Sequence, residues 1–173
     1  EKIPIDLDGV FTTSWHPFEN KIAFMGHKDD SSDIYIIDLN SDEITNITND
    51  IFSDSSPSWS PNGKIIYFTS DRGENTNANN MFDVDFSQTD IFQYSLELDT
   101  VSQLTNTEYN ENYPVADSDG NLYYTADYNG ITNIFRHDLI NNEAFPITNV
   151  ITGVQQIDLD NNNNLVFSGF KKR

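Results

Sequence analysis

The chain repeats itself, and the repeat limits the possible fold more than any other feature of the sequence. Three stretches of equal length begin with Asp or Asn, continue with Ile and an aromatic residue, and end with Ile or Leu followed by Thr: residues 33–48, 90–105 and 133–148. A second block, which contains an apolar run, precedes each of them and occurs a fourth time: residues 14–26, 58–70, 115–127 and 158–170. The pattern predicts one supersecondary unit that recurs and stacks on its neighbours.

Each unit reads as four short strands joined by turns. The second strand is an unbroken apolar run in three of the units: Ile65–Phe68, Leu122–Tyr124 and Leu165–Phe167. A strand of a β-sandwich faces water on one side and alternates apolar with polar residues, whereas the inner strands of a propeller blade are covered on both faces by neighbouring blades. The sequence therefore predicts an all-β fold, a β-propeller of four-stranded antiparallel blades.

The repeats divide the chain into about three and a half blades of a single propeller domain or fragment, residues 1–173. The expected units are blade one at about 11–48, blade two at about 56–105, blade three at about 113–148 and a partial blade four at about 155–170. Residues 1–5 fall where the outer strand of a preceding blade is expected. In an alternative arrangement they complete the last blade of a four-bladed ring, or two copies of the chain form one larger ring.

One block carries a family resemblance. Residues 58–73 read Ser-Trp-Ser-Pro-Asn-Gly-Lys-Ile-Ile-Tyr-Phe-Thr-Ser-Asp-Arg-Gly, and an Asp-Ile-aromatic start and a closing Leu-Thr follow them. This pattern resembles the TolB-like β-propeller repeat over roughly residues 11–170. The resemblance implies a ring of six to eight blades, with the remaining blades supplied by the same or another chain. It also implies a bacterial periplasmic or cell-surface location, and fusion in some relatives to a peptidase domain.

The charge of the chain excludes two classes of partner. Its 28 acidic and 9 basic residues give a formal net charge of −19, which repels the phosphates of nucleic acids and anionic lipid headgroups. Basic protein surfaces and metal cations suit this charge better, although a dispersed acidic surface also serves solubility alone. No cysteine is present, so disulfides and thiolate chemistry are excluded, and no apolar run is long enough for a membrane span. We therefore expect a protein or peptide partner, no nucleic acid and no membrane insertion.

Candidate partner-binding residues lie in the loops that share one face of a propeller: those between the fourth strand and the next first strand, and between the second and third strands. The second-to-third loop spans nineteen residues in blade two, 71–89, against six in blades one and three. It is expected to bind a partner or cap the channel, or to be an insertion whose aromatic residues pack on the next blade. The candidates are Met81, Phe82, Asp83, Asp85 and Phe86 in this loop, and Asp50, Asp54, Glu108, Tyr109 and Glu111 in the neighbouring ones.

Two turns between first and second strands are rich in oxygen ligands of the kind that calcium prefers. Their candidate ligands are Asp158, Asp160 and Asn162 in one turn, and Asp117 and Asp119 in the other. Asp, Asn and Gly also recur in such turns for backbone reasons alone, so both interpretations stay open. Calcium is the one cofactor that the sequence suggests, and otherwise none is expected.

The sequence gives little support for catalysis within this chain. The three histidines are not spaced as metal ligands, and no Gly-x-Ser-x-Gly nucleophile motif is present. Trp15 and Trp59 recur at one repeat position and are expected to pack between blades rather than to bind sugars. The leading hypothesis is a non-catalytic scaffold for protein or peptide binding. The alternatives are the propeller domain of a larger peptidase or hydrolase, which gates or recruits substrate, and a carbohydrate- or calcium-binding surface module.

Overall fold

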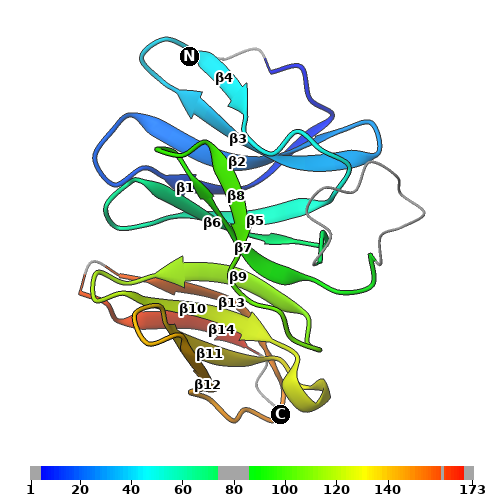
Figure 1. Ribbon diagram of the computed structural model, residues 1–173, viewed down its shortest axis with the longest axis vertical. Helices are drawn as coiled ribbons and strands as arrows, with labels where there is room; N and C mark the ends of the chain where they lie inside the picture. The colour runs from blue at the N-terminus through cyan, green and yellow to red at the C-terminus, as the bar shows by residue number, and fades with distance from the viewer. Residues whose placement is uncertain (1–4, 74–85, 161, 170–173) are drawn as a thin grey trace.

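The computed structural model describes residues 5–73, 86–160 and 162–169, so the candidates Met81, Phe82, Asp83 and Asp85 lie outside the described residues. Within these ranges fourteen strands form three four-stranded sheets and one two-stranded sheet. Figure 1 shows the four-stranded sheets one after another along the long axis, with the two-stranded sheet overlapping the last of them in this view. The described residues contain no α-helix, only a short 3₁₀ turn at Tyr128–Gly130, and no helix among them could cross a membrane.

The strands follow one another in chain order within each sheet, and every pair is antiparallel. Sheet one contains β1 (Gly9–Trp15), β2 (Lys21–Lys28), β3 (Ser31–Asp38) and β4 (Glu43–Asn46). Sheet two contains β5 (Asp54–Trp59), β6 (Ile65–Ser70), β7 (Asp90–Ser95) and β8 (Thr100–Gln103). Sheet three contains β9 (Glu111–Ala116), β10 (Asn121–Ala126), β11 (Asn133–Asp138) and β12 (Glu143–Pro146), and sheet four contains β13 (Val154–Leu159) and β14 (Leu165–Gly169).

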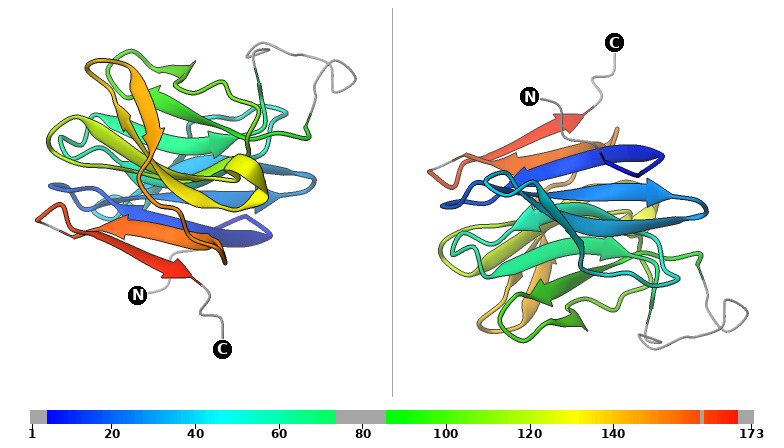
Figure 2. Two further views of the ribbon diagram at one scale, coloured as in Figure 1. Left: turned by 90° about the horizontal axis from the view of Figure 1, so that it is seen from below. Right: turned by 90° about the horizontal axis from the view of Figure 1, so that it is seen from above.

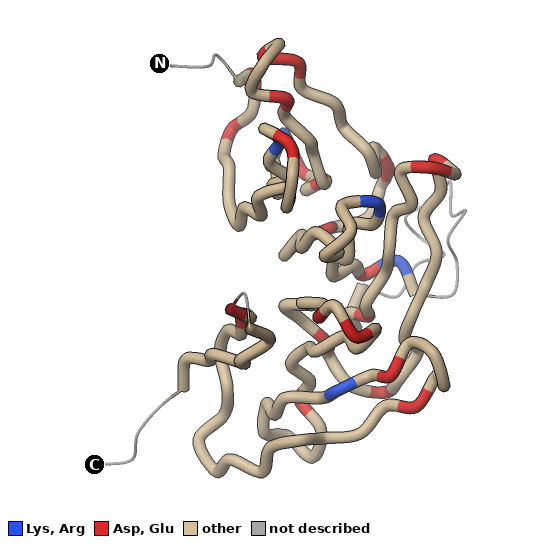
Figure 3. The backbone as a smooth tube through the Cα atoms, turned by 90° about the vertical axis from the view of Figure 1, so that its left-hand side faces the viewer, with Lys and Arg blue, Asp and Glu red and all other residues tan. Residues whose placement is uncertain are grey.

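The hydrophobic core lies between successive sheets. Buried side chains from sheets one and two form one cluster, sheets two and three share a second, and sheets three and four share a third. The first strands β1, β5, β9 and β13 contact one another in sequence, and the sheets follow an arc (Figures 2 and 3). Sheets that press face to face in this way are propeller blades, so the predicted fold class is confirmed.

The closing Thr of the repeat has a structural role. Its hydroxyl accepts a hydrogen bond from the backbone N–H of the Ile that opens the third strand. The three equivalent pairs are Ile34–Thr48 at 3.0 Å, Ile91–Thr105 at 2.8 Å and Ile134–Thr148 at 2.9 Å. Each bond joins the exit of a blade to its third strand, which explains why the ends of the repeated stretch recur together.

The blocks of blades two and three have equal length but differ in register by one residue. The β5–β6 ladder pairs Asp54 with Ser70, whereas the β9–β10 ladder pairs Glu111 with Ala126. The turn of blade three is one residue shorter, so Ala126 rather than Asp127 is the structural equivalent of Ser70. This register determines which side chains of the two blades occupy equivalent places.

The two tryptophans have different surroundings. Trp59 is 6% exposed, lies edge-on to the His16 ring at 4.6 Å, and packs between sheets one and two as expected. Trp15 is 63% exposed, and Val10, Phe11 and Phe18 are exposed as well, so the described residues do not bury it and its packing between blades stays a prediction. Its side of sheet one has no neighbouring sheet in the part of the chain that the structure describes.

Candidate functional site

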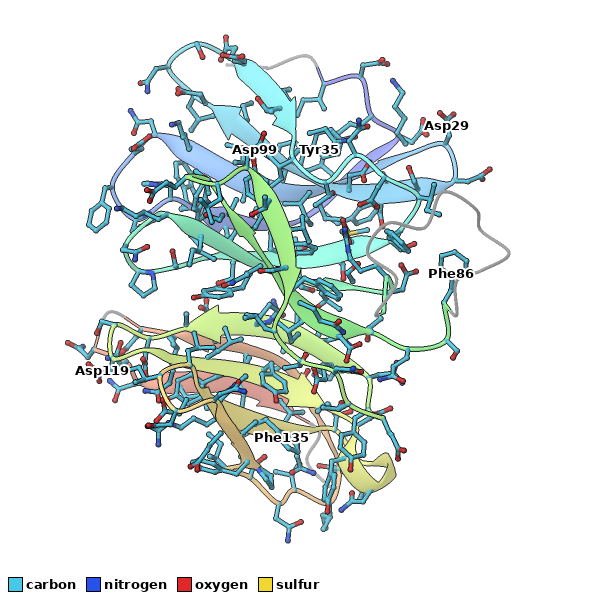
Figure 4. The ribbon with its side chains drawn as sticks, viewed as in Figure 1. Asp29, Tyr35, Phe86, Asp99, Asp119 and Phe135 are labelled. Atoms are coloured by element: carbon cyan, nitrogen blue, oxygen red, sulfur yellow. The ribbon has the colours of Figure 1, made fainter. Side chains whose placement is uncertain are left out.

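The propeller presents its connections on two opposite faces. Figure 4 places Asp29 and Phe86 at one edge of the molecule and Asp119 at the other. We call the side of Asp29 and Phe86 the loop face; it holds the second-to-third loops and the connections between sheets. The opposite side, with Asp119, is the turn face, which holds the short first-to-second and third-to-fourth turns.

A groove of about 330 Å³ runs between the first strands of all four sheets. Polar side chains line much of it, including Thr13, Ser58, Gln156 and Asp158. Ser56 and Tyr113 line it as well, at equivalent irregularities of β5 and β9, and both have left-handed backbones with φ of 52° and 55°. This conformation costs free energy in residues other than glycine, so the packing of the blades must hold it in place.

Blade two buries a cation beside the loop face. The guanidinium of Arg72 lies 5.1, 5.4 and 5.3 Å from the ring centroids of Phe52, Phe68 and Phe92, respectively. Its Nη2 donates to both carboxylate oxygens of Asp54 at 2.6 Å. Its Nη1 donates to Asp50, and its Nε donates to Ser70, both at 2.8 Å. We call this arrangement the Arg72 cage.

The Arg72 cage stabilises a carboxylate that would otherwise be costly to bury. Asp54 is fully buried, and this desolvation raises its pKa to about 6 even though Arg72 opposes the shift. Among the described residues, the one group with metal-ligand spacing is Asp33, Asp50 and Asp54. Arg72 already bonds two of these carboxylates, while Asp33 accepts from Asn46 and Thr48. A guanidinium thus supplies the positive charge at this place.

Blade three has an equivalent arrangement without a cation. Glu111 takes the place of Asp54, and Tyr128 takes the place of Arg72. The Tyr128 ring lies edge-on to Tyr109 and Phe135, at 5.0 and 5.9 Å, and Phe135 stacks on Tyr124. The three aromatic residues Tyr109, Tyr124 and Phe135 correspond to the three Phe residues around Arg72. We call them, with Glu111, the Glu111 cage.

Glu111 is 1% exposed, and its carboxyl group is only partly satisfied. Oε1 accepts a hydrogen bond from the Thr107 hydroxyl at 3.1 Å, whereas Oε2 is buried with no partner. Burial raises the pKa of Glu111 to about 7, although hydrogen bonds from the side chains of Thr105 and Thr107 oppose the shift, and the nearby charge of Asp90 adds to it. The carboxyl therefore exchanges a proton near neutral pH, with no cation to stabilise its ionised form.

Known proteins share these repeats. Residues 7–88 match the TolB β-propeller domain family. These residues carry TolB-type propeller repeats. TolB from Acinetobacter baumannii has a similar fold, with a TM-score of 0.70 at 22% identity over 92% of this chain and 37% of that one. The β-propeller domain of the Trilobed protease from Pyrococcus furiosus has a TM-score of 0.60 at 17% identity, over 84% of this chain and 44% of that one.

A curated relative adds a sequence match but no function. An uncharacterized protein of Agrobacterium fabrum is 24% identical over 123 residues, which is 71% of this chain and 37% of the relative. The chain therefore spans a little over a third of the length of this relative and of the Acinetobacter TolB. The structural matches at these identities establish the fold.

The structure places the sequence-predicted partner-binding residues at different depths. Phe86 and Glu108 are exposed on the loop face, and Asp50 and Tyr109 are partly buried. Asp54 and Glu111 are buried, so their side chains lie behind the loop face and not on its surface. The cages bring Asp50 together with Asp54, and Tyr109 together with Glu111.

Each predicted calcium turn is organised by one aspartate. Asp117 accepts hydrogen bonds from the backbone N–H groups of Asp119 and Asn121, both at 2.9 Å. Asp160 accepts from Asn162 and Asn164 in the same way, both at 2.8 Å. Asp158 accepts from the backbone N–H of its neighbour Leu159. These bonds account for the Asp residues as turn formers, and calcium binding at the turns stays a prediction.

Sequence reasoning did not single out Arg72 or Tyr128, the residues that distinguish the two cages. Their equivalence depends on the one-residue difference in register, which equal block lengths conceal. The sequence nevertheless contains a signal. An arginine, Arg72, follows the second strand of blade two, and an aromatic residue, Tyr128, follows the second strand of blade three.

Proposed function

We propose that this chain is a non-catalytic propeller scaffold that binds a protein or peptide on its loop face, in the periplasm or at the cell surface of a bacterium. The observation that carries the proposal is a loop face whose connections are fixed by hydrogen bonds to aspartate side chains. Asp71 accepts a hydrogen bond from the backbone N–H of Ser53, and Asp127 accepts one from that of Asn110, both at 2.7 Å. Fixed loops lose little conformational entropy on binding, which favours affinity.

The charge and the aromatic residues of the loop face support a basic partner. Asp29, Asp30 and Glu108 are exposed there, and so are the rings of Phe86 and Tyr128. With a net charge of −19, the chain attracts cationic surfaces from a distance, and exposed aromatic rings offer contact area once they meet. A protein or peptide rich in Arg and Lys suits both features.

A displayed library of random peptides tests the proposal. We expect selection on the wild-type chain to enrich basic peptides, and the Asp29→Lys, Glu108→Lys double variant to lose their binding. The matched control, Glu97→Lys with Asp119→Lys, makes the same change of charge on the turn face and is expected to bind nearly as well. Equal loss in both variants, or in neither, would contradict a loop-face site. Deletion of residues 75–86 tests separately whether the long loop takes part.

Further blades are also part of the proposal. Trp15 is exposed on one side of sheet one, while its repeat equivalent Trp59 is buried by sheet one. In sheet four, Val166 and Phe167 are exposed as well. We infer that other blades, from the same or another chain, cover these surfaces. In a Trp59→Phe variant of the whole gene product, Trp15 should then be protected from acrylamide quenching; quenching as strong as in this chain alone would contradict the inference.

A second candidate function is the propeller domain of a larger peptidase or hydrolase that gates or recruits substrate. The similarity to the propeller domain of the Trilobed protease favours it, although it extends to the fold only. A peptidase assay on the whole gene product, alongside its propeller-deleted form, separates the two candidates. Peptide hydrolysis that depends on the propeller would replace the scaffold proposal with this one.

A further inference from the structure

The two cages suggest what the loop face recognises. In the Arg72 cage, three aromatic rings and two carboxylates surround an arginine that the chain itself supplies. In the Glu111 cage, three aromatic rings and a buried carboxyl occupy the same places, but the chain supplies Tyr128 instead. The fold thus places three aromatic rings and a buried carboxyl group at equivalent positions twice, and it provides a cation once.

Two observations indicate that the Glu111 cage is suited to a ligand. The Oε2 atom of Glu111 is buried and has no hydrogen-bond partner, which is a costly state for a carboxyl oxygen. The side chain that covers the cage, Tyr128, is exposed on its outer side and is held by edge-on ring contacts with Tyr109 and Phe135. Such contacts are weak enough for an incoming group to displace.

We propose that the Glu111 cage binds the guanidinium group of an arginine from the partner, which takes the place of the Tyr128 ring. Glu111 serves as the counter-ion, and the rings of Tyr109, Tyr124 and Phe135 form the walls. A planar guanidinium suits this site better than an ammonium, because it stacks on aromatic faces and donates two parallel hydrogen bonds to one carboxylate. The proposal rests on the proposed loop-face function, since the partner must deliver its arginine there.

A small probe tests the cage without any partner. Isothermal titration at pH 8, where Glu111 is ionised, uses n-butylguanidinium as the probe and the neutral n-butylurea as its control. We expect saturable binding of n-butylguanidinium to the wild-type chain and none of n-butylurea. In Glu111→Gln, which keeps the shape and removes the charge, the affinity should fall about tenfold or more.

Two further variants define the site. Tyr128→Arg should abolish probe binding because the new side chain fills the cage, whereas Asp119→Asn, which removes one charge from the turn face, should bind as the wild type does. The proposal is overturned if the wild-type chain binds n-butylguanidinium no better than n-butylurea, or if Glu111→Gln binds it as tightly as Asp119→Asn does.

The peptides selected on the loop face test the cage independently of the small probe. If n-butylguanidinium binds but no peptide is selected, the proposed loop-face function is contradicted and the proposed arginine site is not. Arginine-containing peptides that bind Glu111→Gln and the wild type equally would overturn the cage and leave the loop-face function. The two proposals therefore fail in different ways.

Discussion

In blade two the buried Asp54 lies against a guanidinium, whereas in blade three no Lys or Arg of the described ranges forms an ion pair with the buried Glu111. The two carboxyl groups begin equivalent first strands and stand behind equivalent rings. The difference teaches that two blades of one chain can bury a carboxyl group at the same place and still balance its charge in different ways. In blade two Asp54 already has its ion-pair partner, Arg72. In blade three the carboxyl group of Glu111 can still gain a proton or a cation.

The largest effect is expected from Arg72→Met. This variant keeps much of the side-chain volume but leaves Asp54 buried and unpaired, so the free energy of unfolding should fall by about 3–5 kcal/mol. Urea unfolding at pH 7 measures it. Adding Asp54→Asn to Arg72→Met should restore a good part of the loss. A loss below about 1 kcal/mol would mean that the ion pair contributes little beyond hydrophobic packing.

The next effect is a dependence on pH that belongs to blade three. The folded-state pKa of Glu111 is about 7, above the value of about 4.3 for an exposed Glu, so the folded state favours the neutral acid. The stability that this preference contributes is complete below about pH 4.3 and is lost as the pH rises through 7, a change of about 3 kcal/mol. Urea unfolding between pH 4 and pH 8 measures it.

Glu111→Gln isolates this contribution from the other titrating groups. Asp54 changes stability in the same direction, because its pKa is raised to about 6. Asp117, Asp138 and Asp160 act in the opposite direction. Burial opposes the shift at Asp117, but hydrogen bonds to the three carboxylates lower their pKa values. The difference between the wild type and Glu111→Gln should therefore grow with pH in favour of the variant. Parallel profiles would show that Glu111 keeps an ordinary pKa.

The repeat made the fold predictable, and the register limited what could be said of the site. Unbroken apolar second strands indicated blades covered on both faces, and the structure confirms them. The closing Thr was visible as a pattern, but its bond to the third strand needed the geometry. The equivalence of Arg72 and Tyr128 was hidden, because a turn shortened by one residue shifts every later position without changing the block length. An ion pair between residues 18 positions apart, such as Asp54 and Arg72, leaves no pattern that can be recognised in the sequence.

A smaller effect is expected from Tyr128→Arg, which places a guanidinium in the Glu111 cage at the position that Arg72 has in blade two. The new guanidinium should bond the ionised Glu111 and lower its pKa, which outweighs the lost contacts with Tyr109 and Phe135. At pH 8 we expect a gain of about 1 kcal/mol in the free energy of unfolding. Tyr128→Met, which loses the same ring contacts without adding a charge, is the control. If both variants lose stability equally, the two cages are not interchangeable.

The smallest effect is expected in blade one, where Lys28 occupies the position of Arg72 and Asp6 that of Asp50. Lys28 bonds Asp6 at 2.7 Å, but their side chains are 48% and 100% exposed. Val10 stands in place of Asp54, so no buried carboxylate depends on the lysine. Water screens such a pair, and Lys28→Met should leave the urea midpoint within experimental error. A loss close to that of Arg72→Met would show that position in the repeat, rather than burial, determines the strength of the ion pair.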